Sequence, residues 1–210
     1  HAALSPKSRE ETDRPGIADL DSWVDLENNG SPDDYSWSEA TGTVSPGGDG
    51  IPEIRMFPNG ADGSLPSGNR GTVNIGGNSN STAVLIDQIY NGVDCNDLDY
   101  HGGSLDFSEG PVTLSGNPGI SNGMKTAVTA VIGQPRVIFL FTAVTGNGAN
   151  TEYTVVRVVG ARIMAVTMTG PMSNRAVIIQ PASLQHPSLI PGSAPISTYG
   201  TLLASPRLVK

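Results

Sequence analysis

The segment DCNDLDYH, residues 94–101, brings three carboxylates and one imidazole into eight consecutive positions. Carboxylate oxygens at close spacing are ligands that Ca²⁺ prefers. We therefore predict Asp97 and Asp99 as calcium ligands, because a bound ion would offset the repulsion between them. Two alternatives stay open here. One is a solvated acidic loop after a helix, and the other is a hydrolase site that uses Asp97, Asp99 and His101.

A second acidic segment, DLDSWVDLENNG at residues 19–30, offers oxygen ligands at similar spacing. It resembles a calcium-binding EF-hand loop only loosely, because Gly30 falls far from the glycine that such a loop needs at its sixth position. We predict Asp19, Asp21 and Asp25 as the ligands of a calcium ion bound in this segment. A solvated acidic chain is again the alternative.

The remaining residues provide little for catalysis. The chain has three histidines, and none of them belongs to a nucleophile, zinc-protease or phosphate-binding motif. We therefore predict that the protein is not an enzyme. The only cysteine, Cys95, allows no internal disulfide and no cysteine-based zinc site, and we expect it to be a small buried apolar residue.

Composition points to a β-rich extracellular protein rather than a helical cytosolic enzyme. Charged residues make up only 15% of the 210, and the chain holds 26 glycines and 16 prolines. The formal net charge is −8, and it is unevenly spread. Residues 1–109 hold 19 acidic and five basic residues, whereas residues 110–210 hold one acidic and seven basic. The overall sign argues against nucleic acid as a partner, and the two halves can attract each other within a molecule or between neighbours.

The chain contains no segment with the pattern of a signal peptide or a membrane span. Its longest apolar run, VIFLF at residues 137–141, is too short to cross a bilayer. Because the chain opens on His1 rather than Met, we expect a processed product or an excerpt of a longer precursor. Contact with a membrane is then expected only through a precursor helix that this chain lacks.

Two segments have the pattern of amphipathic helices, at residues 81–91 and 121–132. Ser81, in the sequence NST, can cap the first helix, and Gly92 can end it. Ser121 can cap the second. The glycine-rich stretch before the first helix is expected to be a shaped loop between a strand and that helix, without chemistry of its own.

Apolar and alternating runs predict strands in the rest of the chain. They cover residues 51–57, 71–76, 136–144, 152–170 and 175–182, and a hairpin is expected at residues 103–116. Pro52 should hold the first strand at an edge, and Gly160 should break or bulge the long, central one. We predict an α+β, β-rich fold, with a mostly antiparallel sheet, two helices on one face and an extended N-terminal arm.

The predicted arm comprises residues 1–50, and a single domain comprises residues 51–210. The arm is polar and acidic, yet it carries both tryptophans of the chain, Trp23 and Trp37. We expect these two residues to form an assembly interface, in which the arm of one copy docks on the strand-rich half of the next and covers a sheet edge. The alternative is that the arm folds back on its own domain.

Several motifs from about residue 55 to residue 210 resemble one protein family in content and order. They are FPNG…LPSGNRGTVNIGGNSNST, ISNGMK, IGQPRVIFLF, TEYTVVRVVGARIM, VIIQPA and SPRLVK. Together they are similar to the C-terminal exported region of TadE/TadG-like Flp pilus-assembly proteins of planctomycete-type bacteria. The resemblance implies a secreted bacterial protein whose exported domain follows a transmembrane helix, and it brings no catalytic residue.

These observations lead to a functional hypothesis. We expect a structural subunit of an extracellular filament or cell-surface assembly that polymerises by head-to-tail contacts. Its partners would be further copies of itself or other cell-surface proteins, at the bacterial surface or outside the cell. The alternative is a surface-displayed carbohydrate- or calcium-binding module.

Overall fold

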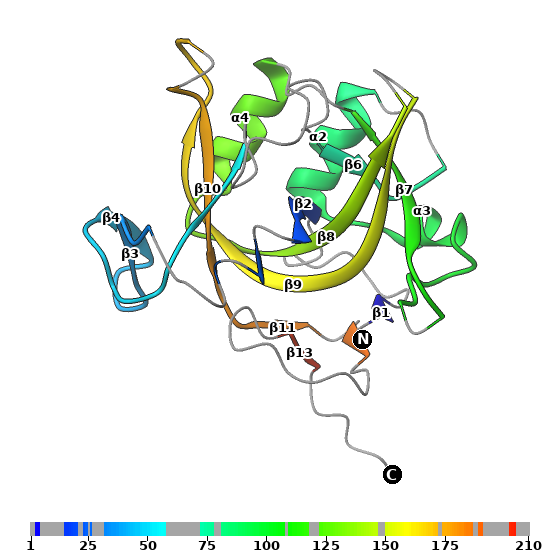
Figure 1. Ribbon diagram of the computed structural model, residues 1–210, viewed down its shortest axis with the longest axis horizontal. Helices are drawn as coiled ribbons and strands as arrows, with labels where there is room; N and C mark the ends of the chain where they lie inside the picture. Colours follow the sequence, from blue (N-terminus) through cyan, green and yellow to red (C-terminus); the bar gives the residue numbers. More distant parts are fainter. Residues whose placement is uncertain are drawn as a thin grey trace.

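The computed structural model of the chain shows an α+β, β-rich fold with a mostly antiparallel sheet, which confirms the predicted fold class (Figure 1). The structure describes residues 3–4, 15–20, 23–24, 26, 32–57, 72–77, 81–107, 109–117, 122–146, 150–171, 174–186, 189–190 and 202–204.

A seven-stranded sheet forms the centre of the fold. Its strands are β2 (Pro15–Asp19), β5 (Ile54–Phe57), β6 (Thr72–Asn74), β7 (Val112–Asn117), β8 (Pro135–Thr145), β9 (Thr151–Thr167) and β10 (Ala176–Pro181). The main path runs β2-β8-β9-β10-β5, and β7 pairs with both β9 and β6. The strand β9 is central, as predicted, because it pairs with β8, β10 and β7. Figure 1 shows β8 and β9 as long, strongly bent ribbons that run together.

The two ends of the main path differ in direction. At one end β5 lies antiparallel to β10, which confirms the predicted edge strand beside Pro52. At the other end β2 runs parallel to β8, from the pair Pro15↔Val137 to the pair Asp19↔Phe141. The bend of the sheet brings β5 back towards β2. A segment from the predicted arm therefore supplies one border of the sheet.

The predicted break at Gly160 is wrong. There β9 continues without interruption and pairs with Val137 of β8. Its register shifts lie elsewhere, near Val155 opposite β8 and near Met164 opposite β10. The glycine is needed for a different reason, because a Cβ at Gly160 would lie 2.4 Å from the carbonyl oxygen of Ala182.

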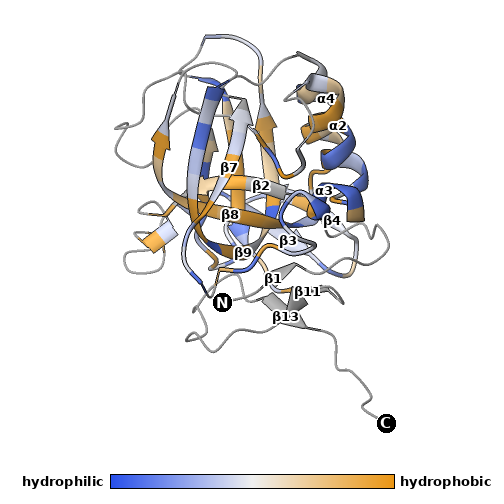
Figure 2. Cartoon of the chain, turned by 90° about the vertical axis from the view of Figure 1, so that its right-hand side faces the viewer, coloured by the Kyte–Doolittle hydropathy of each residue, from blue (hydrophilic) through white to orange (hydrophobic). Residues whose placement is uncertain are grey.

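Both predicted main helices are present. Helix α2 (Thr82–Asn91) begins after Ser81, whose hydroxyl accepts a hydrogen bond from the backbone N–H of Val84, and it ends before Gly92. Helix α4 (Asn122–Ala130) is the second, and the predicted cap Ser121 lies outside the described residues. Figure 2 shows α2 and α4 together on one side of the sheet. A short helix, α3 (Cys95–Asp99), follows α2.

The core has two parts, one on each face of the sheet, and alternate residues of β8 supply both. Ile138 and Leu140 join the part that α2 and α4 cover, whereas Val137, Phe139 and Phe141 join the other. This period of two is what a strand with two buried faces requires. The near-continuous apolar run of β8 follows directly from it.

The predicted hairpin at residues 103–116 is wrong. Among the described residues of this range only β7 forms a strand, and it pairs with β6 and β9 instead of the preceding segment.

Among the described residues, three two-stranded sheets accompany the main one. They are β3 (Tyr35–Ser38) with β4 (Thr43–Pro46), β1 (Ala3–Leu4) with β12 (Leu189–Ile190), and β11 (Leu184–His186) with β13 (Leu202–Ala204). The β3–β4 hairpin projects from one side of the molecule in Figure 1. No helix among the described residues is both long and apolar enough to cross a membrane.

Candidate functional site

The predicted calcium ligands at residues 94–101 lie on and around α3. Asp94 and Asp97 form a reciprocal capping box, in which each carboxylate accepts a hydrogen bond from the other residue's backbone N–H at 3.0 Å. Asp97 is buried, whereas Asp99 is exposed. The carboxylate of Asp97 thus holds the start of the helix. Among the described residues, no group of three or more acidic, histidine or cysteine side chains is placed to hold a metal ion. Calcium binding by Asp97 and Asp99 stays a prediction.

His101 is likewise engaged in a local contact. Its Nε2 lies 2.6 Å from the carbonyl oxygen of Ile75, the residue after β6. This contact ties the turn after α3 to the glycine-rich segment, in which a Cβ at Gly76 would lie 2.6 Å from Oδ1 of Asp97. A buried amide pair, Gln88 Nε2 to Asn74 Oδ1 at 3.0 Å, holds the same strand end against α2. The glycines here permit close packing between a loop and α3.

Cys95 does not occupy the predicted environment. The prediction of a buried residue is wrong, because Cys95 is exposed at the first position of α3. Cys95 lies on the solvent side of the first turn of this short helix. Leu98, which is 4% exposed, is the residue of α3 that packs in the apolar core.

The second set of predicted calcium ligands gives no geometry to assess. Asp21 and Asp25 lie outside the described residues, and only the backbone of Asp19, the last residue of β2, is described. Calcium binding by Asp19, Asp21 and Asp25 therefore stays a prediction.

Trp23 is the most deeply buried of the predicted assembly residues. It is 0% exposed and belongs to the core part beneath α2 and α4, together with Ala18 of β2 and Leu26. The start of the chain thus contributes one strand and one large aromatic side chain to the main domain. In this single chain, the predicted arm therefore folds back on its own domain, which is the alternative to docking on a neighbouring copy.

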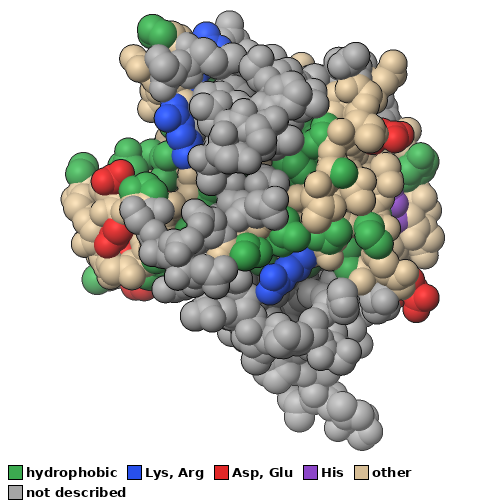
Figure 3. Space-filling view, viewed as in Figure 1, with side chains coloured by type: hydrophobic (Ala, Val, Ile, Leu, Met, Phe, Trp, Pro, Cys, Tyr) green, Lys and Arg blue, Asp and Glu red, His purple; other side chains and the backbone are tan. Residues whose placement is uncertain are grey.

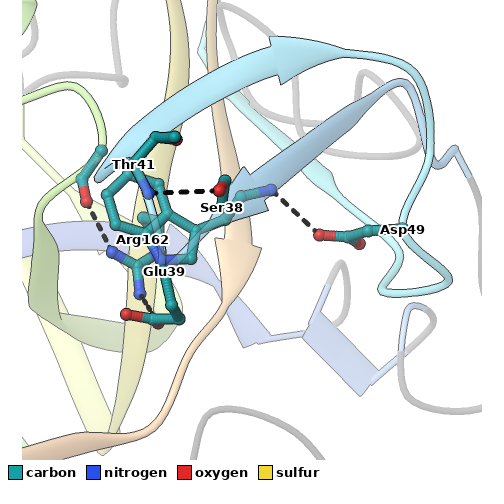
Figure 4. A network of polar contacts seen from close by, with 7 residues as sticks. Ser38, Glu39, Thr41, Asp49 and Arg162 are labelled. Atoms are coloured by element: carbon teal, nitrogen blue, oxygen red, sulfur yellow. Dashed lines mark hydrogen bonds and ion pairs between the residues drawn. The ribbon is translucent and has the colours of Figure 1, made fainter.

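Trp37 docks the β3–β4 hairpin on the outside of the same chain. The guanidinium carbon of Arg162, on β9, lies 3.8 Å from the centre of the Trp37 ring. Arg162 also donates to the carbonyl oxygen of Gly133 at 2.6 Å and to Glu39 Oε1 at 3.4 Å. Figure 4 shows Arg162 beside Glu39 and beneath the hairpin. The Trp37 indole nitrogen is buried and has no hydrogen-bond partner in the part of the chain that the structure describes.

Carboxylates also hold the outer edge of β3, and sequence reasoning missed this network. Glu53 is 1% exposed and accepts hydrogen bonds from the backbone N–H groups of Asp34 and Tyr35, both at 2.8 Å. Asp49 accepts from the N–H of Trp37 at 3.1 Å. The N–H groups of Tyr35 and Trp37 would pair with a further strand, so Glu53 and Asp49 take the place of that strand's carbonyls.

The same network anchors the hairpin to the sheet. Asp49 Oδ1 accepts a hydrogen bond from the side chain of Gln180, a buried residue of β10, at 2.8 Å. Asp33 in turn accepts from the N–H groups of Asp49 and Gly50. Figure 3 shows acidic side chains gathered over β3 and β4. The turn sequences SPDDY and GGDG are the signal in the chain that could have indicated these contacts.

Burial raises the pKa of Glu53, and the neighbouring carboxylates of Asp33 and Asp34 raise it further. The N–H groups of Asp34 and Tyr35 act in the opposite direction. Burial also lowers the pKa of Arg162, and this effect exceeds the opposing one from Glu39. Burial therefore destabilises the charged form of both Glu53 and Arg162. Such burial is consistent with a structural role for the two residues in docking the hairpin.

No protein-family model, curated protein or solved structure matches this chain.

Proposed function

We propose that the protein is a structural subunit of an extracellular filament or cell-surface assembly. In this assembly, β2 of one copy pairs with β8 of the next copy, and Trp23 of the first copy fills the core of the second. The observation that carries the proposal is the N-terminal segment itself, which adds a parallel border strand to β8 and buries Trp23 completely in the core.

The place that β2 fills cannot be left empty. Residues 137–141 of β8 pair with β2, and all of them are buried. Without β2 they would present an apolar edge with unpaired N–H and C=O groups, which promotes uncontrolled pairing with other chains. Either the same chain or a neighbour must therefore supply the strand. Supply by a neighbour is a heterologous contact, and it produces an open fibre when its rotation does not close a ring.

The charge distribution supports exchange between copies. The half of the chain that contains β2 carries 19 acidic and five basic residues, and the half that contains β8 carries one acidic and seven basic. Opposite net charges speed the encounter of two copies and favour the orientation in which the N-terminal segment meets the sheet.

In the β3–β4 hairpin, side chains already occupy the outer edge of β3. Glu53 and Asp49 already accept the outward N–H groups of Tyr35 and Trp37. On the partner strand, Pro46 lacks an N–H group. Trp37 thus serves to hold the hairpin on its own chain, and the proposed interface between copies involves Trp23.

The test is a variant in which the N-terminal segment is locked to its own domain. Ala18 and Leu140 are register partners on β2 and β8, and both belong to the same part of the core. Cysteines at both positions, in a Cys95→Ser background, can form an intramolecular disulfide. Deletion of residues 1–45 is less informative, because it removes Trp23 from the core and would lower stability in any case.

Electron microscopy and light scattering should show regular fibres for the wild-type protein and monomers for the oxidised, locked variant. Reduction of the disulfide should restore the fibres, because it frees the segment again. Fibres from the locked variant would contradict exchange of β2, and an unassembled wild-type protein at all concentrations would contradict the structural function itself.

A further inference from the structure

We propose that Tyr100 and Asn96 form a binding platform for a neutral, β-linked, gluco-configured sugar chain. This inference is independent of the proposed assembly. It begins from the side chain of Tyr100, which is 69% exposed and is the most exposed large hydrophobic residue in the described part of the chain.

The ring of Tyr100 is exposed but held in place. The rings of His101 and Tyr100 are perpendicular, with centres 5.1 Å apart and planes at 89°. His101 is itself fixed by the 2.6 Å contact between its Nε2 and the carbonyl oxygen of Ile75. An aromatic ring that is already fixed loses little conformational entropy when a ligand binds.

Gly77 packs directly against the ring of Tyr100. A Cβ at this position would lie 2.4 Å from Cδ2 of Tyr100 and 2.9 Å from Cε2. Any other residue would push the ring away, so a glycine is required for this approach. The glycine-rich segment after β6 therefore supports the exposed aromatic ring and also packs against Asp97.

Asn96 adds a polar group at the right place on the helix. It is exposed and lies four residues before Tyr100, whose backbone continues the helical conformation of α3. Side chains at this spacing are neighbours on one helix face. The Asn96 amide can both donate to and accept from hydroxyl groups beside the ring.

The chemistry of this corner selects the class of sugar. The face of an aromatic ring carries partial negative charge and attracts polarised C–H groups. A gluco-configured β-pyranose carries its ring substituents equatorially, so its axial C–H groups form a flat face that can lie on the ring. The carboxylates of Asp94, Asp97 and Asp99 nearby, and the net charge of −8, disfavour acidic sugars.

The test uses saturation-transfer NMR and titration of the full chain with cellohexaose, and with hexagalacturonate as an acidic comparison. Saturation should pass to the axial ring protons of cellohexaose and not to hexagalacturonate. Tyr100→Ala should weaken the affinity at least about tenfold, which corresponds to about 1.4 kcal/mol. Tyr100→Trp should retain binding.

A matched control is Ile132→Ala, which removes a different exposed hydrophobic side chain, 36% exposed, at the end of the α4 region. It should leave binding unchanged, and circular dichroism should show that every variant is folded. The proposal is overturned if the wild-type protein gives no saturation transfer to cellohexaose, or if Tyr100→Ala binds it as well as the wild type does.

Discussion

At the scale of single residues, several carboxylates in the described part of the chain accept hydrogen bonds from backbone N–H groups. Asp94 and Asp97 cap α3, and Asp49 and Glu53 cover the edge of β3. A carboxylate that accepts such bonds is a strong acceptor at a fixed position. Asp97, which the clustering of carboxylates in the sequence suggested as a calcium ligand, also caps α3, and calcium binding by Asp97 and Asp99 stays a prediction.

Glu53 provides a prediction about pH. Its pKa is raised above the ordinary value of 4.5, mainly by burial. A carboxyl group whose pKa rises on folding stabilises the folded state fully below the unfolded value, and this contribution is lost as the pH rises through the folded value. We therefore expect the free energy of unfolding of the wild type, relative to Glu53→Gln, to fall as the pH rises from below 4.5 through that window.

Chemical denaturation at a series of pH values measures this difference. Glu39→Gln is the matched variant, because it makes the same substitution at an acidic residue of the same region with 83% of its side chain exposed. A difference between wild type and Glu53→Gln that stays constant, or that rises with pH, would contradict the assigned role of burial.

At the scale of elements, helices and strands with local signals could be predicted from the sequence. The start of α2 follows from Ser81 and its end from Gly92, and the apolar run of β9 indicates a central strand. These features depend on neighbouring residues in the chain. The hairpin predicted at residues 103–116 failed, because β7 finds its partners in β6 and β9, which are distant in sequence.

The candidate site was harder to predict for the same reason. The approach of Gly77 to Tyr100, the stacking of Trp37 on Arg162 and the acceptance of the Tyr35 N–H by Glu53 all join distant segments. Residue type and spacing carry no information on such pairings. Trp23 could be anticipated as a docked residue, since a large aromatic side chain in a polar segment is costly to leave in water.

The docking of the β3–β4 hairpin gives a prediction at this scale. Arg162→Ala removes the cation that lies on the Trp37 ring and the hydrogen bond to Gly133. We expect a loss of about 1–3 kcal/mol in the free energy of unfolding, from the lost stacking and hydrogen bond. Amide hydrogen exchange at residues 35–46 should become faster.

Two further variants separate the contributions to this docking. Glu39→Gln should leave hairpin exchange nearly unchanged, because an exposed ion pair contributes little. Trp37→Phe should be tolerated better than Arg162→Ala, since it keeps a ring under the guanidinium and removes the buried indole N–H that lacks a partner. Equal protection of the hairpin in the wild type and in Arg162→Ala would show that the stacking does not hold it.

At the scale of the whole molecule, the fold depends on a strand from the beginning of the chain. The strand β2 borders the sheet beside β8, and Trp23 fills the core between the sheet and α2 and α4. The residues that connect Leu26 to Pro32 lie outside the described part. An element that is essential to the core can be exchanged between identical copies at low energetic cost.

The most direct measurement of this exchange mixes two single-cysteine proteins, both in a Cys95→Ser background. One carries Ala18→Cys on β2, and the other carries Leu140→Cys on β8, its register partner. As a control, Val166→Cys and Val177→Cys are mixed in the same way, because these register partners lie on β9 and β10, which follow each other directly in the chain. After co-assembly and oxidation, the account predicts a disulfide-linked heterodimer from the first mixture and none from the control. Assembled fibres in which the first mixture yields no such cross-link would contradict the account.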